Sequence, residues 1–275
     1  MTERTPNGGA DASRFDRSDG SVYDRRRAWL AEYFDRTAAR TWAQLTSDAP
    51  VRGVRRTVRA GRELMRTTLR DWLPADLTGR TVLDAGCGTG MLAIELAQRG
   101  ASVIAIDLSP TLVGIARERA EAVGVAERID FRATDMLDAS RERVDHVVCM
   151  DSLIHYPVAE MVGALALLAG AARISILTTF APRTPMLSVM HATGRLFPRG
   201  SRAPAIEPVA ESELRRAIVA NPALAGWQAR RTFRVATGFY TSQAFEMART
   251  VPERDNGADL VPALNSLAST GMHSS

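Results

Sequence analysis

Short apolar runs alternate with helical stretches from residue 81 onward. The runs predict five strands at 81–85, 102–106, 129–133, 144–150 and 174–180. Helical patterns fit between them at 90–99, 110–123 and 158–172, and residues 135–142 leave room for a short helix. This alternation is typical of a parallel sheet with helices on both faces.

The order changes after the fifth run. Five prolines surround an apolar stretch at 186–197, which predicts an insertion over about 182–208. A helix near 210–220 and strands near 227–236 and 238–246 complete the pattern. We therefore predict an α/β fold: a Rossmann-like, seven-stranded, mostly parallel sheet with helices on both faces.

The segments outside this pattern differ in character. Residues 1–22 are polar and predict a disordered lead-in, and 251–275 predict a flexible tail. Between 23 and 80, Val58, Met65 and Leu69 fall near one helical face, with arginines largely elsewhere. This predicts a helical arm or lid ahead of a main domain at 81–250.

Composition narrows the possible function classes. The 275 residues, 45% of them hydrophobic, suffice for one sizeable core. No transmembrane-length apolar run or signal-peptide segment is visible, so we expect a cytoplasmic protein. All 35 basic residues are arginines, but the net charge of only +4 does not indicate nucleic-acid binding. Cys87 and Cys149 are expected to be free thiols, and no metal-ligand spacing occurs.

A glycine-rich loop follows the first predicted strand. Gly86, Gly88 and Gly90 form G-x-G-x-G immediately before a helix. Glycines permit a tight turn and close approach of a ligand. Nicotinamide dehydrogenases use G-x-G-x-x-G instead. Asp84, just before the loop, would repel a pyrophosphate but suits a ligand with an ammonium group.

Acidic residues also follow the next two strands. Asp107, with Leu108 beside it, is expected to accept hydrogen bonds from ribose hydroxyls. Its alternative role is a helix cap, for which Ser109 is better placed. Asp135 is expected to accept the adenine amino group while Met136 packs on the ring. The alternative for Asp135 is a turn or cap.

This joint pattern resembles the class I S-adenosylmethionine-dependent methyltransferases over residues 80–246. The resemblance implies S-adenosylmethionine as the methyl donor. It also implies that the residues after the fourth strand border the methyl group, since ligands bind at the carboxyl ends of parallel strands. There Met150 is expected to contact the cofactor, Asp151 and Tyr156 the substrate, and His155 is the catalytic candidate. His146, inside the strand, is expected to be structural.

A narrower resemblance rests on residues 33–38, followed by Arg40 and Trp42, and on residues 150–156. These segments, with 180–182, 194–199 and 238–240, resemble the magnesium-protoporphyrin O-methyltransferase family. The family implies methyl transfer to a propionate carboxylate of magnesium protoporphyrin IX, giving the monomethyl ester in chlorophyll or bacteriochlorophyll synthesis. Magnesium then enters only as part of the substrate.

The same resemblance implies roles for individual residues. His155 would orient the carboxylate or remove its proton, and Tyr33 would supply a second polar contact from the arm. Trp42 would stack on the macrocycle or pack within the arm. The arm arginines would meet the second propionate or form a solvated face. A magnesium chelatase subunit is a candidate partner, and membrane contact is at most peripheral, at the inner membrane.

Two other interpretations stay open at this point. One is a methyltransferase for a quinone-type phenol or a small carboxylic acid. A phenol, with a pKa of about 10, would need His155 as a true base. The other is a regulator that binds the cofactor without catalysis, since a fold alone does not imply an activity.

Overall fold

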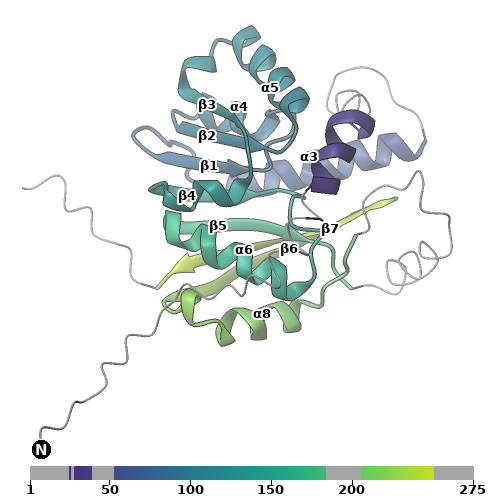
Figure 1. Cartoon of the computed structure of the whole chain (residues 1–275), viewed down its shortest axis with the longest axis vertical. Helices are drawn as coiled ribbons and strands as arrows, with labels where there is room; N and C mark the ends of the chain where they lie inside the picture. Colours follow the sequence, from purple (N-terminus) through teal and green to yellow (C-terminus); the bar gives the residue numbers. More distant parts are fainter. Residues whose placement is uncertain (1–24, 26–27, 39–52, 184–205, 251–275) are drawn as a thin grey trace, which may run out of the picture.

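A seven-stranded sheet forms the centre of the molecule (Figure 1). The computed structural model describes residues 25, 28–38, 53–183 and 206–250. The strand order is β3-β2-β1-β4-β5-β7-β6, parallel from β3 to β5, with β7 antiparallel to both β5 and β6. The strands are β1 Thr81–Ala85, β2 Ser102–Asp107, β3 Ile129–Ala133, β4 Val144–Cys149, β5 Ala172–Phe180, β6 Trp227–Thr237 and β7 Tyr240–Arg249. The predicted fold class is confirmed.

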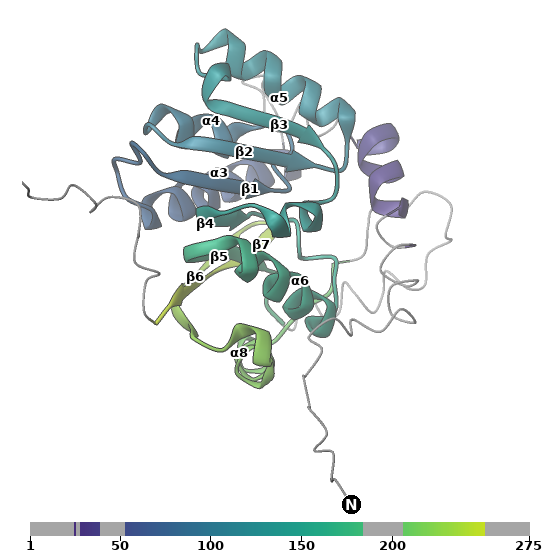
Figure 2. The same ribbon diagram turned by 60° about the vertical axis from the view of Figure 1, so that its left-hand side comes forward.

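Helices cover both faces of this sheet, as Figures 1 and 2 show. One hydrophobic cluster joins the sheet to α3, α4 and α5, and a second joins it to η3, α6 and α8. The bounds are η1 Tyr33–Ala38, α3 Val54–Trp72, α4 Met91–Gln98, α5 Pro110–Ala122, η2 Ala126–Arg128, η3 Met136–Arg141, α6 Val158–Ala171, α8 Glu211–Ala220 and η4 Pro222–Leu224. The predicted helices at 90–99, 110–123, 158–172 and 210–220 lie at these positions.

The central strands are easy to predict because helices bury both faces of the sheet. Every residue of β4 is buried, and the strand is apolar except for Asp145 and His146. Asp145 accepts a hydrogen bond from the Thr81 backbone N–H at 2.9 Å, and His146 Nδ1 lies 2.8 Å from Ser175 Oγ. Burial lowers the pKa of His146. His146 therefore has the structural role predicted for it.

Helix α3, which belongs to the predicted arm, packs on the core of the domain. Met65 and Leu69, on the predicted apolar face, are fully buried in the same cluster as β1 and α4. The helix also packs on β6 and β7. Gly61 permits this packing, because a Cβ there would overlap the ring of Tyr240, whose Cγ would lie 2.8 Å away.

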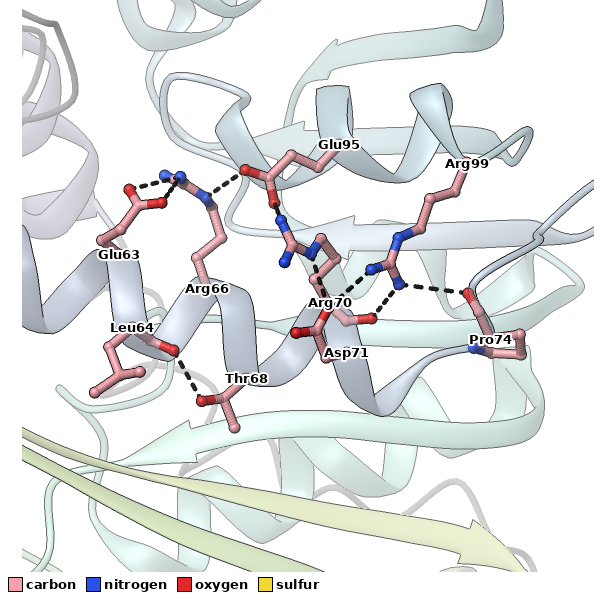
Figure 3. A network of polar contacts seen from close by, with 9 residues as sticks. All are labelled: Glu63, Leu64, Arg66, Thr68, Arg70, Asp71, Pro74, Glu95 and Arg99. Atoms are coloured by element: carbon pink, nitrogen blue, oxygen red, sulfur yellow. Dashed lines mark hydrogen bonds and ion pairs between the residues drawn. The ribbon is translucent and has the colours of Figure 1, made fainter.

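Charged side chains clamp α3 to α4, the helix that follows the glycine loop (Figure 3). Glu95 of α4 accepts hydrogen bonds from Arg66 Nε at 2.8 Å and from Arg70 Nη1 at 3.4 Å. Arg99 donates to Asp71 at 2.8 Å and to the Arg70 carbonyl at 2.7 Å. Several of the arm arginines are thus ion-paired against the domain instead of lying on a purely solvated face.

Some predictions fall outside the described residues. These are the lead-in at 1–22, the tail at 251–275, Arg40, Trp42 and most of the insertion. The insertion's two ends meet where Pro182 and Val209 form an isolated parallel bridge. Among the described helices, none is long and apolar enough to span a membrane.

The contact between Gly61 and Tyr240 predicts how firmly α3 is seated. Gly61→Ala should lower the free energy of unfolding by about 1–3 kcal/mol, because the added methyl forces α3 and β7 apart. Gly114→Ala in α5 is the matched control, since a Cβ there meets nothing within 4 Å. It should be neutral or slightly stabilising. Equal denaturation curves for Gly61→Ala and wild type would contradict this packing account.

Candidate active site

One cavity of about 330 Å³ lies at the carboxyl ends of β1, β2 and β4. The glycine loop forms its floor, and α3 and the N-terminal helical segment form two of its walls. Residues of the predicted site that line it are Asp84, Gly86, Gly88, Asp107, Leu108, Met136, Met150, Asp151, His155 and Tyr156. The topology therefore gathers most of the predicted donor and acceptor residues in one chamber.

Each glycine of the loop has a left-handed backbone, but their surroundings differ. At Gly86 a Cβ would lie 2.5 Å from Ser152 Cβ, and at Gly90 one would lie 2.7 Å from Ala116 Cβ. At Gly88 a Cβ would meet nothing within 4 Å. Gly86 and Gly90 thus serve internal packing, while Gly88 faces the space available to a ligand.

Asp84 is the most unusual carboxylate of the site. It is 1% exposed, and its Oδ2 has no hydrogen-bond partner among the residues that the structure describes. Burial, together with the negative charge of Asp107, raises the pKa of Asp84 to about 7. A buried carboxylate of this kind calls for a cation or a hydrogen-bond donor beyond those that the described residues supply. The ammonium group of an amino-acid-like ligand meets that need.

Asp107 organises the loop from the end of β2. Its Oδ2 accepts from the Gly88 N–H and its Oδ1 from the Ser109 N–H, both at 2.9 Å. Burial raises the pKa of Asp107. Each carboxylate oxygen has a second lone pair, so acceptor capacity is left for ribose hydroxyls. Ser109 caps α5 by accepting from the Leu112 N–H, as expected of the better cap.

Asp135 caps a short helix, which was the alternative role that the sequence suggested for it. Its Oδ1 accepts from the Leu137 N–H at 2.9 Å and caps η3, and the side chain is buried. Its neighbours Thr134 and Met136 line the cavity instead. Recognition of an adenine amino group by Asp135 stays a prediction, while Met136 is placed to pack against a ring.

The acceptor side of the cavity is an anchored loop after β4. Leu153 and Tyr156 are buried in the core, and the Tyr156 N–H donates to the Leu153 carbonyl at 3.2 Å. The Ile154 carbonyl accepts from the Glu207 N–H at 2.9 Å. His155 projects from this braced turn to the cavity, where its ring lies 6.0 Å from that of Phe34.

The N-terminal helix contributes a different aromatic residue from the one expected. Phe34 and Leu30 line the cavity, whereas Tyr33 lies outside its lining and stacks on Trp29 at 6.1 Å. Asp35 fixes the helix against α5 by accepting from Ser109 Oγ at 2.8 Å. The polar contact assigned to Tyr33 stays a prediction, and Phe34 is a wall residue that the sequence did not single out.

Asp151 lines the cavity, but its carboxylate is engaged within the protein. It accepts from Arg62, Thr179, Tyr240 and Ser242, at distances of 2.6 to 3.2 Å. Sequence reasoning missed these four partners. They lie on other elements, and the resemblance around residues 238–240 was the only signal that touched them.

The two cysteines are free thiols, as predicted. Cys87 sits in the glycine loop and Cys149 is buried at the end of β4. Burial, followed by the charge of Asp84, raises the pKa of both. Neither thiol is thereby activated as a nucleophile.

Asp84 predicts a pH dependence for binding of a ligand with an ammonium group, such as S-adenosylhomocysteine. Such a ligand binds the ionised carboxylate, and protons compete below the pKa of about 7. Affinity should therefore fall about tenfold for each pH unit below that value and level off above it. Isothermal titration calorimetry from about pH 5.5 to about pH 8.5 measures this change in affinity.

Asp84→Asn removes the charge and should weaken binding about 10- to 100-fold at pH 8, with a nearly flat profile. Asp130→Asn is the control, because Asp130 is exposed on β3 and pairs with Arg132. It should bind as the wild type does. A wild-type affinity that stays constant from about pH 5.5 to about pH 8.5 would exclude this role for Asp84.

Comparison with known proteins identifies the family of this chain. The family described as "Magnesium-protoporphyrin IX methyltransferase C-terminus" matches residues 149–249, and a general methyltransferase domain matches 82–173. The magnesium-protoporphyrin O-methyltransferase of Rhodobacter capsulatus is 42% identical over 227 residues, which are 82% of this chain and 98% of that protein. The corresponding enzyme of Synechocystis is 34% identical, over 80% of this chain and 95% of that protein.

A solved structure is similar as well. The crystal structure of magnesium protoporphyrin IX methyltransferase from Synechocystis PCC 6803, with bound S-adenosylhomocysteine, superposes with a TM-score of 0.72. It is 32% identical, and the match covers 82% of this chain and 99% of that one. The chain uses S-adenosylmethionine as its methyl donor, and it belongs to the magnesium-protoporphyrin O-methyltransferase family of class I methyltransferases.

Proposed function

We propose that this protein transfers a methyl group from S-adenosylmethionine to one propionate carboxylate of magnesium protoporphyrin IX. The products are the monomethyl ester and S-adenosylhomocysteine. The observation that carries the proposal is the shared cavity, with Asp84 and the glycine loop at its donor end and His155 at its acceptor end. The 42% identity to a relative that bears this activity in its name supports the choice of substrate.

The chemistry asks mainly for positioning. The sulfonium cofactor supplies an electrophilic methyl group, and a propionate with a pKa of roughly 4 to 5 is already ionised near neutral pH. A carboxylate oxygen forms the new bond to carbon while the carbon–sulfur bond breaks and its electron pair stays on sulfur. The protein must strip water from the carboxylate and hold it about 3 to 3.5 Å from the methyl carbon.

The cavity walls fit this task. Leu30, Phe34 and Met136 provide apolar surface that excludes water, and His155 supplies a polar group to orient the carboxylate. Removal of a proton by His155 is required only if burial keeps the carboxyl protonated. Tyr33, one helix position before Phe34, remains a proposed second contact when substrate is bound.

Arginines along α3 suit the second negative charge of the substrate. Arg59, Arg62 and Arg66 all line the cavity, at helical spacing on one side of α3. A dianionic porphyrin would place its other propionate beside this row, where it would share donors with the carboxylates that already pair with Arg62 and Arg66. Trp42, predicted to stack on the macrocycle, lies outside the described residues.

The proposal extends to how the porphyrin arrives. We include delivery by a magnesium chelatase subunit and, at most, peripheral contact with a membrane. Magnesium would enter bound in the macrocycle. Binding of nucleic acid has no place in this function.

The function is tested by incubating the protein with magnesium protoporphyrin IX and S-adenosylmethionine and measuring the product mass. One methyl group should be added, and only with the metalloporphyrin present. Quinone-type phenols and small carboxylic acids are the comparison substrates. Methylation of a phenol but not of the porphyrin would replace the proposed acceptor, and no methylation of any acceptor would favour a cofactor-binding regulator.

His155 is the side chain whose loss should separate catalysis from cofactor binding. His155→Phe should reduce kcat about 100-fold or more, because the carboxylate loses its orienting partner. Affinity for S-adenosylhomocysteine should change less than about threefold, since the donor end is untouched. Unchanged turnover in this variant would remove His155 from the mechanism.

A further inference from the structure

Asp151 has a backbone conformation that stands out. Its φ of 54° makes it the one non-glycine residue with a positive φ in the described part of the chain. Such conformations carry a free-energy cost for residues with a side chain, although Asp and Asn tolerate them best. The surrounding contacts must therefore hold Asp151 in place. It is also the second residue after β4, at the start of the loop that carries His155.

The Asp151 side chain gathers three distant elements at one carboxylate. Arg62 of α3 donates to Oδ2 at 2.6 Å, and Tyr240 and Ser242 of β7 donate at 3.0 and 3.1 Å. Thr179 of β5 donates to Oδ1 at 3.2 Å and accepts from the Asp151 N–H at 2.7 Å. The carboxylate is 4% exposed. The four side chains that contact it lie between 28 and 91 residues away in sequence.

The chain leaves this hub directly into the active site. Ser152 donates to the Ala85 carbonyl at 2.9 Å and packs against Gly86, the first glycine of the cofactor loop. His155 follows three residues later. The position of Asp151 thus sets where the acceptor loop starts relative to the donor loop.

The same carboxylate also fixes a cation on the opposite wall. Arg62 lines the cavity, and its guanidinium is 20% exposed while paired to Asp151. A buried ion pair contributes little net stability compared with apolar packing, because both charges lose their hydration. A buried hydrogen-bond network can instead hold the groups of an active site in fixed relative positions.

We propose that Asp151 is a positioning residue for methyl transfer. It seats α3 and β7 against the start of the acceptor loop, and so holds His155 and Arg62 in register with the methyl donor. This inference rests on the proposed function, because it concerns catalysis of the same transfer. It replaces direct substrate contact as the main role of Asp151, since the carboxylate is already engaged by protein donors.

Asp151→Asn tests the proposal with little change of shape. Asn tolerates the left-handed backbone, so the loop keeps its path while the pair with Arg62 loses its charge. We expect kcat per cofactor-binding site to fall about 10- to 100-fold, because small misplacements of reacting groups have effects of that size. Affinity for S-adenosylhomocysteine should stay within about threefold of wild type.

Asp145→Asn is the matched control, because it changes a buried aspartate near the start of β4, the strand that precedes Asp151. Asp145 pairs with Arg80 at 3.4 Å and accepts from the Thr81 N–H, away from the cavity. It should lower the Tm but leave kcat within about twofold. If Asp151→Asn behaves in the same way, Asp151 is only structural and the proposal is wrong.

A double-mutant cycle with Arg62 gives a second readout. Arg62→Met keeps the apolar stem and should lower kcat, and adding Asp151→Asn should cause little further loss because the pair acts as a unit. If the fold-changes in kcat of the two single variants multiply to give that of the double variant, Arg62 and Asp151 act independently and the proposed coupling is wrong.

Tyr240→Phe covers the case in which Asp151→Asn does not fold. It removes one hydroxyl donor and should reduce kcat about threefold to tenfold, with unchanged cofactor affinity. Wild-type kcat in Tyr240→Phe would then overturn the proposal. Failure of the wild-type protein to methylate the porphyrin would instead refute the proposed function.

Discussion

A buried carboxylate without a full set of partners lies at the centre of this molecule. Asp84 is the last residue but one of β1, close to the glycine loop, and one of its oxygens has no donor within the described protein. Burial raises its pKa to about 7, so near neutral pH the carboxyl group of the free protein is partly protonated. A cationic ligand would stabilise the ionised form. The rest of the site is arranged around that unsatisfied group.

The sheet and its covering helices turn this group into a reaction chamber. Strands β2 and β4 flank β1, so the acidic end of one and the histidine loop of the other open on the same space. Helix α3 closes one side and is held there by buried apolar packing and by the pairing of Arg66 and Arg70 with Glu95. The donor end carries Asp84 and Asp107, and the α3 wall carries three arginines beside Glu63, which suits a cationic methyl donor and an anionic acceptor.

Sequence reasoning succeeded where a local pattern carries the information. The continuous apolar runs located the strands, and the glycine spacing located the donor loop before any geometry was known. It was less successful where a role depends on residues that meet only through the topology. Asp151 looked like a substrate contact because of its place after β4, yet its carboxylate is occupied by donors from α3, β5 and β7. Sequence could not decide between the two roles of Asp135, and it did not single out Phe34, since the direction of a side chain at a strand end or along a short helix cannot be read from its neighbours in sequence.

The most direct test of this account is a carbon-13 NMR titration of protein labelled at its aspartate carboxyl groups. The Asp84 resonance is assigned by its loss in Asp84→Asn. In the free protein it should titrate with a pKa of about 7. We expect the ammonium group of S-adenosylhomocysteine to pair with this carboxylate, so that saturation with the ligand lowers the pKa to about 5 or below. The same midpoint with and without that ligand would contradict the account.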